Sequence, residues 1–320
     1  MERTRIKRLR SYIKWALWVL LVQLILVNVS AAIYAYRFTH FYKGQPPVST
    51  SNNFFSKTWK LFTGPKFYKL ETTAAPGFPV EHITLATDNG LSIKGWYGAT
   101  DSARGCVVLF HGVTVNKNYV LTEAAKFYQW GYNVLMVDFR GHGESEGMYT
   151  TFGVSETEEV QKAYEFAKSK GNQKIFLYGV SLGAVAILKA VPEKNLQPAG
   201  IIAEMPFDNL HNHFKSRATQ VGFPRQPFAF LVTFWAGIEN GYNGFRHSVV
   251  KYSKEVRCPV LLQWGEKDWL VSREHIEDVY VNIGAEKKKL VTYENADHES
   301  LLRADPMLWE KEVGEFLDGL

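Results

Sequence analysis

The stretch Gly179-Val180-Ser181-Leu182-Gly183 decides the fold of this chain. An apolar, strand-like run at residues 174–178 precedes it, and a helix-like run at residues 184–190 follows it. A serine on so sharp a strand-to-helix turn projects its hydroxyl out of the sheet, where it is free to attack a substrate. Glycine is needed on both sides because a Cβ would collide with the crowded backbone of the turn. We therefore predict that Ser181 is a nucleophile held between a strand and a helix.

Strand-like and helix-like segments alternate from residue 81 to residue 320. Asp88-Asn89-Gly90 is a tight-turn sequence between two strand-like runs, so the body should open with an antiparallel hairpin. Ser155-Glu156-Thr157-Glu158 fits a capping box that starts a helix. The alternation predicts an α/β fold with a mostly parallel sheet and helices on both faces. Its later strands are expected at residues 106–110, 133–138, 174–178, 200–204, 259–264 and 288–293.

The interval of about residues 206–255 breaks this alternation. It is rich in phenylalanine and also contains Pro224 and Pro227. We interpret it as a small inserted helical cap. Its aromatic side chains could serve either as core or as substrate contacts, and the sequence leaves both readings open.

A serine hydroxyl is a weak nucleophile and needs a base, usually a histidine that a carboxylate orients. Asp268 follows the predicted strand at 259–264, and His298 follows the one at 288–293. Both should therefore lie on loops at the carboxyl edge of the sheet, together with Ser181. We predict Ser181 as nucleophile, His298 as general base and Asp268 as orienting acid, with Glu204 and Asp208 as alternative acids.

These features resemble the serine hydrolases of the α/β-hydrolase superfamily, and within it the membrane-anchored, esterase-like members. The resemblance covers residues 80–320 and includes Phe110-His111-Gly112, the turn at residues 138–145, the serine turn, and the acid and histidine loops in that order. It implies an α/β-hydrolase fold. It also implies an oxyanion hole formed by the backbone N–H groups of Leu182 and Val113. The chain departs from the lipase pattern because Val113 and Thr114 follow His111-Gly112 in place of a run of glycines.

Other polar residues in these motifs are predicted to have structural or solvent-exposed roles. His111 and His142 precede Ser181 and lie in glycine-rich turns, so we expect them to shape the pocket or stabilise the turns. Asp297 and Glu266 are expected at the surface.

No metal or cofactor is predicted. The histidines are not paired at ligand spacing, and no phosphate-binding loop of the G-x-x-x-x-G-K type is present. Cys106 and Cys258 each lie at the edge of a predicted strand, where two buried thiols are expected; a disulfide between the two strands is the alternative.

Residues 13–36 form an apolar run with aromatic residues near both ends, as expected of a transmembrane helix or signal anchor. A cleaved signal peptide is the alternative. The basic residues before the run predict a cytoplasmic tail at residues 1–12 and a catalytic domain on the non-cytoplasmic side. The predicted organisation continues with a linker at 37–80 and an α/β-hydrolase domain at 81–320.

The positive net charge comes from the N-terminus. Residues 1–14 hold one acid and six bases, which are Arg3, Arg5, Lys7, Arg8, Arg10 and Lys14. The rest of the chain has 31 basic and 31 acidic residues, from totals of 37 and 32. A nucleic-acid partner is therefore not predicted. The sequence makes no prediction of oligomeric state.

The predicted function is cleavage of a carboxylic ester or thioester through an acyl-enzyme on Ser181. The substrate would be a small-molecule or lipid-like acyl ester. The same three residues could also serve an acyltransferase, a thioesterase or a peptidase, and a catalytically inactive binding protein on this scaffold is a further alternative.

Overall fold

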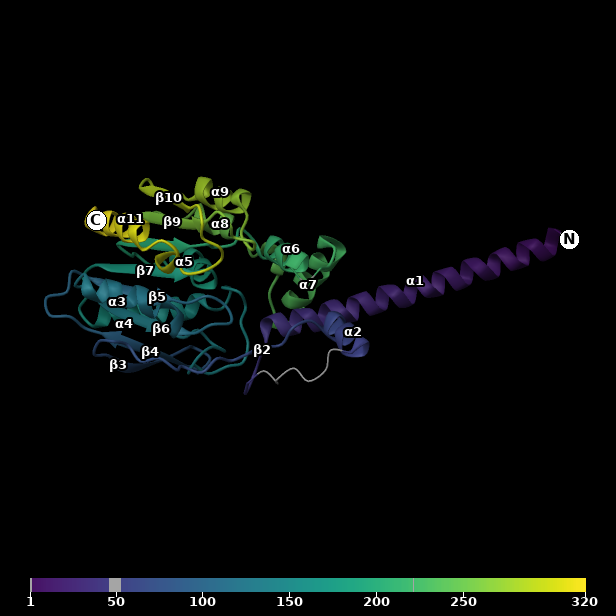
Figure 1. Ribbon diagram of the computed structural model, residues 1–320, viewed down its shortest axis with the longest axis horizontal. Coiled ribbons are helices and arrows are strands. Elements are labelled where there is room, and N and C mark those ends of the chain that lie inside the picture. Colours follow the sequence, from purple (N-terminus) through teal and green to yellow (C-terminus); the bar gives the residue numbers. More distant parts are fainter. Residues whose placement is uncertain (1, 46–52, 221) are drawn as a thin grey trace.

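The structure, a computed structural model, describes residues 2–45, 53–220 and 222–320 (Figure 1). A sheet flanked by helices forms the body, and a small group of helices lies between this body and a long N-terminal helix (Figure 1). The N-terminus lies far from the body, at the free end of that helix (Figure 1).

Within the described ranges, the main sheet has eight strands in the order β10-β9-β8-β7-β5-β6-β4-β3. Strands β3 and β4 form an antiparallel hairpin, β4 pairs antiparallel with β6, and the remaining pairs are parallel. The predicted hairpin and the six later strands are thus confirmed, with bounds within two residues of those expected. The strands are β3 (Glu81–Ala86), β4 (Ser92–Gly98), β5 (Cys106–Phe110), β6 (Asn133–Val137), β7 (Ile175–Val180), β8 (Gly200–Glu204), β9 (Val260–Gly265) and β10 (Lys288–Tyr293).

Helices cover both faces of this sheet, as predicted. On one face, Phe127 and Trp130, at the end of α3 (Leu121–Gln129), contact Trp309 of α11 (Pro306–Asp318) with ring centroids 5.5 and 5.9 Å apart. The short 3-10 helix η1 (Lys117–Val120) leads into α3, and α10 (Leu301–Ala304) precedes α11. On the other face lie α4 (Thr157–Ser169), α5 (Leu182–Glu193), α8 (Val249–Ser253) and α9 (Arg273–Asn282).

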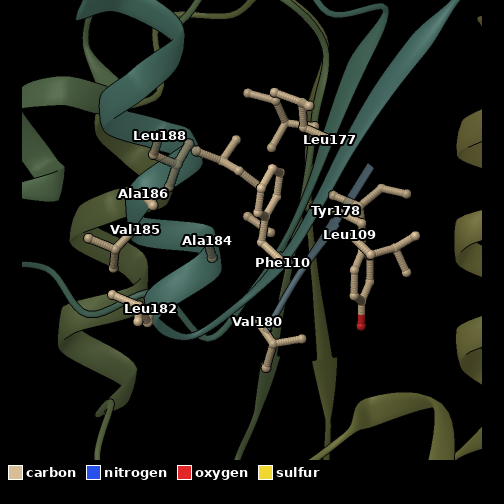
Figure 2. Packing of buried hydrophobic residues seen from close by; sticks show 14 of the residues in the cluster. Leu109, Phe110, Leu177, Tyr178, Val180, Leu182, Ala184, Val185, Ala186 and Leu188 are labelled. Atoms are coloured by element: carbon tan, nitrogen blue, oxygen red, sulfur yellow. The ribbon is translucent and has the colours of Figure 1, made fainter. Parts of the chain in front are cut away.

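The core is formed where β5 and β7 meet α5 (Figure 2). Phe110 points from β5 toward α5, whereas Leu109 and Tyr178 lie on the other side of the strands (Figure 2). All three side chains are fully buried. Because successive strand residues face opposite sides of a sheet, continuous apolar runs are needed where both faces are covered, and β5 and β7 have them.

The predicted capping box at residues 155–158 is wrong. Helix α4 starts at Thr157, and no side chain caps its first turn. Glu158 is the acid that would close the box, but its carboxylate accepts the Asp88 N–H and pairs with Arg140 at 2.9 Å. The Ser155 N–H, which it would reach, donates instead to the Thr151 hydroxyl at 2.7 Å. The local motif yields here to contacts with other parts of the fold.

The interval predicted as an inserted cap contains α6 (Leu210–Gln220), α7 (Arg225–Asn240) and the 3-10 helix η2 (Gly244–Arg246). We call α6, α7 and η2 the cap. Helix α8, which ends the interval, packs against α5 and α9 and so belongs to the body. Cys106 and Cys258 are free thiols, the first buried and the second half-buried.

The long helix α1 (Glu2–Thr39) is exposed along its first part and packs on the cap at its end. Tyr34 and Phe38 are buried there, and the Phe38 ring stacks on Phe214 of α6 at 5.8 Å. The predicted linker at 37–80 contains β1 (Phe41–Tyr42), α2 (Phe54–Thr63) and β2 (Phe67–Tyr68), while its residues 46–52 lie outside the described residues.

Candidate active site

Ser181 lies between the last residue of β7 and the first residue of α5. Its backbone has φ 51° and ψ −109°, a left-handed conformation that is strained for a residue with a side chain. A Cβ on Gly179 would lie 2.5 Å from the carbonyl carbon of Gly183, and one on Gly183 would lie 2.4 Å from the Phe110 carbonyl oxygen. The two glycines are therefore required by the turn itself, as the sequence predicted.

The structure brings Ser181, Asp268 and His298 together. The Nε2 atom of His298 lies 3.1 Å from Ser181 Oγ, and its Nδ1 atom lies 2.7 Å from Asp268 Oδ2. With a carboxylate against Nδ1, the neutral ring carries its proton there, so Nε2 is left to accept the serine proton. The other oxygen of Asp268 accepts the N–H groups of Leu270 at 2.7 Å and Val271 at 2.8 Å, which fixes the carboxylate plane.

The two alternative acids make other contacts. Glu204 accepts a hydrogen bond from the indole N–H of Trp309 at 2.7 Å. Asp208 accepts one from the Asn212 amide at 2.5 Å and lies 3.9 Å from His275. Of the three candidate acids, Asp268 is the one that hydrogen-bonds to the imidazole.

Burial raises the pKa of Glu204 to about 8, and the nearby Glu123 carboxyl adds to the shift. An unfolded chain ionises glutamate near pH 4.5, so folding stability from this group is fully present below that pH. It is lost progressively as the pH rises toward 8. We expect Glu204→Gln to reduce the fall of the melting temperature between pH 5 and 8 by about 2–4 °C, measured by thermal unfolding. An unchanged pH dependence would mean that Glu204 is ionised in the folded protein.

The two predicted oxyanion donors flank the serine. Leu182 is the first residue of α5, and the first N–H groups of a helix have no acceptor within it. On the other side, the loop after β5 passes close by: a Cβ on Gly112 would lie 3.6 Å from Ser181 Cβ. Val113 follows Gly112 in this loop. Two backbone segments thus lie beside Ser181, and the donor roles of Leu182 and Val113 stay a prediction.

His111 and His142 are buried, and both rings make hydrogen-bonding contacts with nearby backbone groups. The Nε2 atom of His111 accepts the Phe139 N–H at 3.1 Å, and the Nδ1 atom of His142 lies 2.8 Å from the Arg140 carbonyl oxygen. Burial lowers the pKa of His111 to about 4 and that of His142 to about 3, so both rings are neutral at physiological pH. These contacts fit the predicted structural role. Asp297 and Glu266 are exposed, as expected.

No group of three or more His, Cys, Asp or Glu side chains that could hold a metal ion occurs among the described residues.

The structure adds two residues that the sequence analysis missed. The Trp269 ring lies 6.4 Å from the His298 ring, and the Cζ atom of Arg217 lies 5.3 Å from the Trp269 ring. Arg217 belongs to α6 of the cap. Its signal in the sequence was weak, because it is one basic residue in an interval noted for its aromatic side chains.

The aromatic residues of the predicted cap interval divide between core and surface. Phe207, Phe214 and Phe228 are buried, whereas Phe230 and Phe234 of α7 are exposed.

Comparisons with known proteins find a matching family and similar chains. The family described as "Serine aminopeptidase, S33" matches residues 101–234, a range that includes Ser181 but neither Asp268 nor His298. The uncharacterized protein YqkD of Bacillus subtilis is 28% identical over 262 residues, covering 79% of this chain and 82% of that protein. Lysophosphatidylserine lipase ABHD12 of Danio rerio is 26% identical over 170 residues, covering 50% of this chain and 41% of that protein.

Among solved structures, the Pyrococcus furiosus esterase Pf2001 superposes with a TM-score of 0.67 at 24% identity, covering 80% of this chain and 98% of the esterase. At this identity the likeness concerns the fold, and the fold is the one predicted from the sequence.

Proposed function

Because the chain belongs to the α/β-hydrolase superfamily, we propose that it is a serine hydrolase that cleaves carboxylic esters through an acyl-enzyme on Ser181. The observation that carries this proposal is the hydrogen-bonded series Ser181–His298–Asp268, with distances of 3.1 and 2.7 Å. Three side chains from separate loops meet in the geometry that activates a serine hydroxyl.

In the proposed reaction, Ser181 Oγ attacks the ester carbonyl carbon while His298 Nε2 takes the hydroxyl proton. Asp268 holds the ring in place and stabilises its charged form. The N–H groups of Leu182 and Val113 donate to the tetrahedral oxyanion. His298 then gives the proton to the departing alcohol, and the acyl group stays on Ser181. A water that loses a proton to His298 attacks the acyl-enzyme; His298 then returns that proton to Ser181 Oγ as the bond to the acyl group breaks and the acid leaves.

Two features near the cap support a lipid-like ester as substrate. A cavity of about 400 Å³ between α1, α2 and the start of α7 has a mostly apolar lining that includes Leu26 and Val27 of the predicted membrane span. On α2, Phe54, Phe55 and Trp59 are exposed, as aromatic residues often are where a protein meets the membrane interface. The similarity to a lysophosphatidylserine lipase also favours an ester of this class.

A fluorophosphonate probe tests the proposal, since it reacts with activated serines. We expect covalent labelling at Ser181 in the full chain and faster turnover of esters than of matched thioesters and amides. Labelling together with faster amide cleavage would favour the peptidase alternative. The matching family, described as a serine aminopeptidase, is the observation that favours this alternative. Folded protein that is neither labelled nor active on any of the three would be a binding protein.

We also propose that α1 anchors the enzyme in a membrane, with the body on the non-cytoplasmic side. By length and composition, residues Arg5–Thr39 could cross a bilayer, and their most apolar window has a mean hydropathy of 2.3. Two variants test the orientation, each with Cys258→Ser: one carries Ser11→Cys in the predicted cytoplasmic tail, and the other carries Ser169→Cys on the body. In right-side-out vesicles, an impermeant maleimide should label only the Ser169→Cys variant. Labelling of only the first would reverse the orientation, and labelling of both before detergent is added would contradict a membrane span.

A further inference from the structure

Arg217 is a cation without a counter-charge beside the catalytic loops. Among the described residues, no carboxylate lies within ion-pairing distance of its guanidinium, which makes no hydrogen bond. Its contact is the face of Trp269, 5.3 Å from Cζ to the ring centroid. The ring supplies no oxygen acceptor for the N–H donors of the guanidinium, so these donors are free to bind a ligand.

Elsewhere the same chain pairs a buried arginine with carboxylates. Arg140 donates to Glu159 at 2.6 Å and to Glu158 at 2.9 Å, and Glu159 above all holds its pKa above the usual range. Arg217 has the opposite environment, because desolvation alone acts on it and lowers its pKa to about 10. It stays protonated at neutral pH. Arg217 is half-buried beside the exposed Trp269 ring, and a cation so placed without a counter-charge favours a ligand that brings a negative charge.

Arg217 lies on the face of α6 that packs toward the body. Arg217 lies one helical turn after His213, so the two share one face of α6. His213 is buried against Phe207 and Phe152, with ring centroids 4.9 and 5.3 Å apart, and desolvation lowers its pKa well below the usual value. This face of α6 therefore turns toward the body and has Arg217 as its charged group.

One indole ring lies near both Arg217 and the proposed base. Trp269 directly follows Asp268 in sequence, and its ring lies 6.4 Å from the His298 ring and 5.3 Å from the Arg217 Cζ atom. A substrate whose carbonyl carbon is held at Ser181 could thus place a group a few bonds away against the guanidinium. The planar fork of arginine pairs with carboxylate or phosphate oxygens through two parallel hydrogen bonds.

We propose that Arg217 is a substrate-binding residue that recognises an oxyanion, a phosphate or a carboxylate, carried by the ester substrate a few bonds from the reacting carbonyl. This inference rests on the proposed ester hydrolysis at Ser181 and specifies its substrate class. Negatively charged esters would be preferred to neutral esters of the same acyl chain.

The test compares two esters that differ in one charged group, 1-octanoyl-glycerol and 1-octanoyl-glycerol 3-phosphate, with the full chain in detergent. We expect the native protein to have a kcat/KM about 10- to 100-fold higher for the phosphate ester. Arg217→Gln should remove this preference by lowering kcat/KM for the phosphate ester far more than for the neutral ester. Arg217→Lys should restore part of the preference, since lysine keeps the charge but lacks the fork.

The matched control is Arg246→Gln, which removes an exposed arginine of η2 in the same cap. It should behave as the native protein. A second measurement needs no variant: inorganic phosphate should compete with the neutral ester for the native protein, and neutral glycerol at the same concentration should not. Succinate in place of phosphate distinguishes a carboxylate site from a phosphate site, and competition by either anion supports the proposal.

Equal kcat/KM for the two esters in the native protein, without competition by either anion, would overturn the proposal. So would an equal loss on both esters in Arg217→Gln, which would indicate a structural role. Failure of the proposed function looks different, because the native protein would then hydrolyse neither ester and would not be labelled by fluorophosphonate.

Discussion

Replacing Ser181 by alanine is expected to lower kcat for ester hydrolysis by about 10⁵- to 10⁶-fold. The attacking oxygen is lost, and no other hydroxyl is hydrogen-bonded to His298 Nε2 in the described part of the chain. Residual turnover would come from water activated by His298 beside the oxyanion donors. Initial rates with a chromogenic ester, together with fluorophosphonate labelling, measure this effect.

The fold should survive the Ser181→Ala change. The Oγ atom contacts the imidazole of His298, whereas the strained turn is held by backbone contacts, among them the Ser181 N–H donating to the Glu204 carbonyl oxygen at 2.8 Å. Alanine meets the same steric strain as serine at φ 51°. The melting temperature should therefore change little, in line with loss of one side-chain hydrogen bond, about 1 kcal/mol.

Ser169→Ala is the matched control. Ser169 is an exposed serine in the last turn of α4, before β7 begins, at the edge of the sheet opposite Ser181. It should keep full activity and labelling. Activity retained in a folded Ser181→Ala protein would contradict the proposed nucleophile.

Asp268→Asn is expected to lower kcat by about 10⁴-fold with little change in structure. Two backbone N–H groups, from Leu270 and Val271, donate to Oδ1 of the aspartate, so an asparagine would direct its oxygen toward them. Its NH₂ group would then face His298 Nδ1 and donate to it. The ring would be forced to carry its proton on Nε2, where it cannot accept the proton of Ser181.

The measurement is kcat/KM as a function of pH for the native protein and the Asp268→Asn variant. Glu204→Gln and Asp208→Asn are the controls, because these residues are the alternative acids and neither hydrogen-bonds to His298. Glu204 in particular is already protonated at pH 7, so the isosteric glutamine should leave turnover unchanged. A loss in either control as large as in Asp268→Asn would contradict the assignment of the acid.

Much of the fold could be predicted because each of its sequence signals depends on a short stretch of neighbouring residues. The tight turn at residues 88–90, the alternating strands and helices, and the glycines around Ser181 each restrict a few neighbouring residues, so the sequence alone predicts them. The capping box is also a local motif, but it fails because groups distant in sequence compete for its acid. The Glu158 carboxylate accepts the Asp88 N–H and pairs with Arg140.

The predicted linker shows a second limit. Its polar and aromatic composition did not reveal that Phe38 would stack on Phe214, nor that the Phe41 N–H would donate to the Met148 carbonyl oxygen at 2.7 Å. These contacts join the end of α1 to the cap and the body. They depend on where remote elements come to lie, which no window of sequence records.

The amino-acid order alone therefore established the strand–turn–helix around Ser181, the parallel sheet, and the placing of Asp268 and His298 at its reactive edge. Backbone crowding and the periodicity of side chains act over a few residues, so they determine the turn and the strands. The order of strands and loops along the chain then places Asp268 and His298 at the same edge of the sheet as Ser181. Tertiary packing alone decided which of three carboxylates reaches His298, and left the guanidinium of Arg217 beside Trp269 without a counter-charge. Both outcomes depend on side chains brought together from distant elements, where distances of a few ångströms select one partner and exclude another.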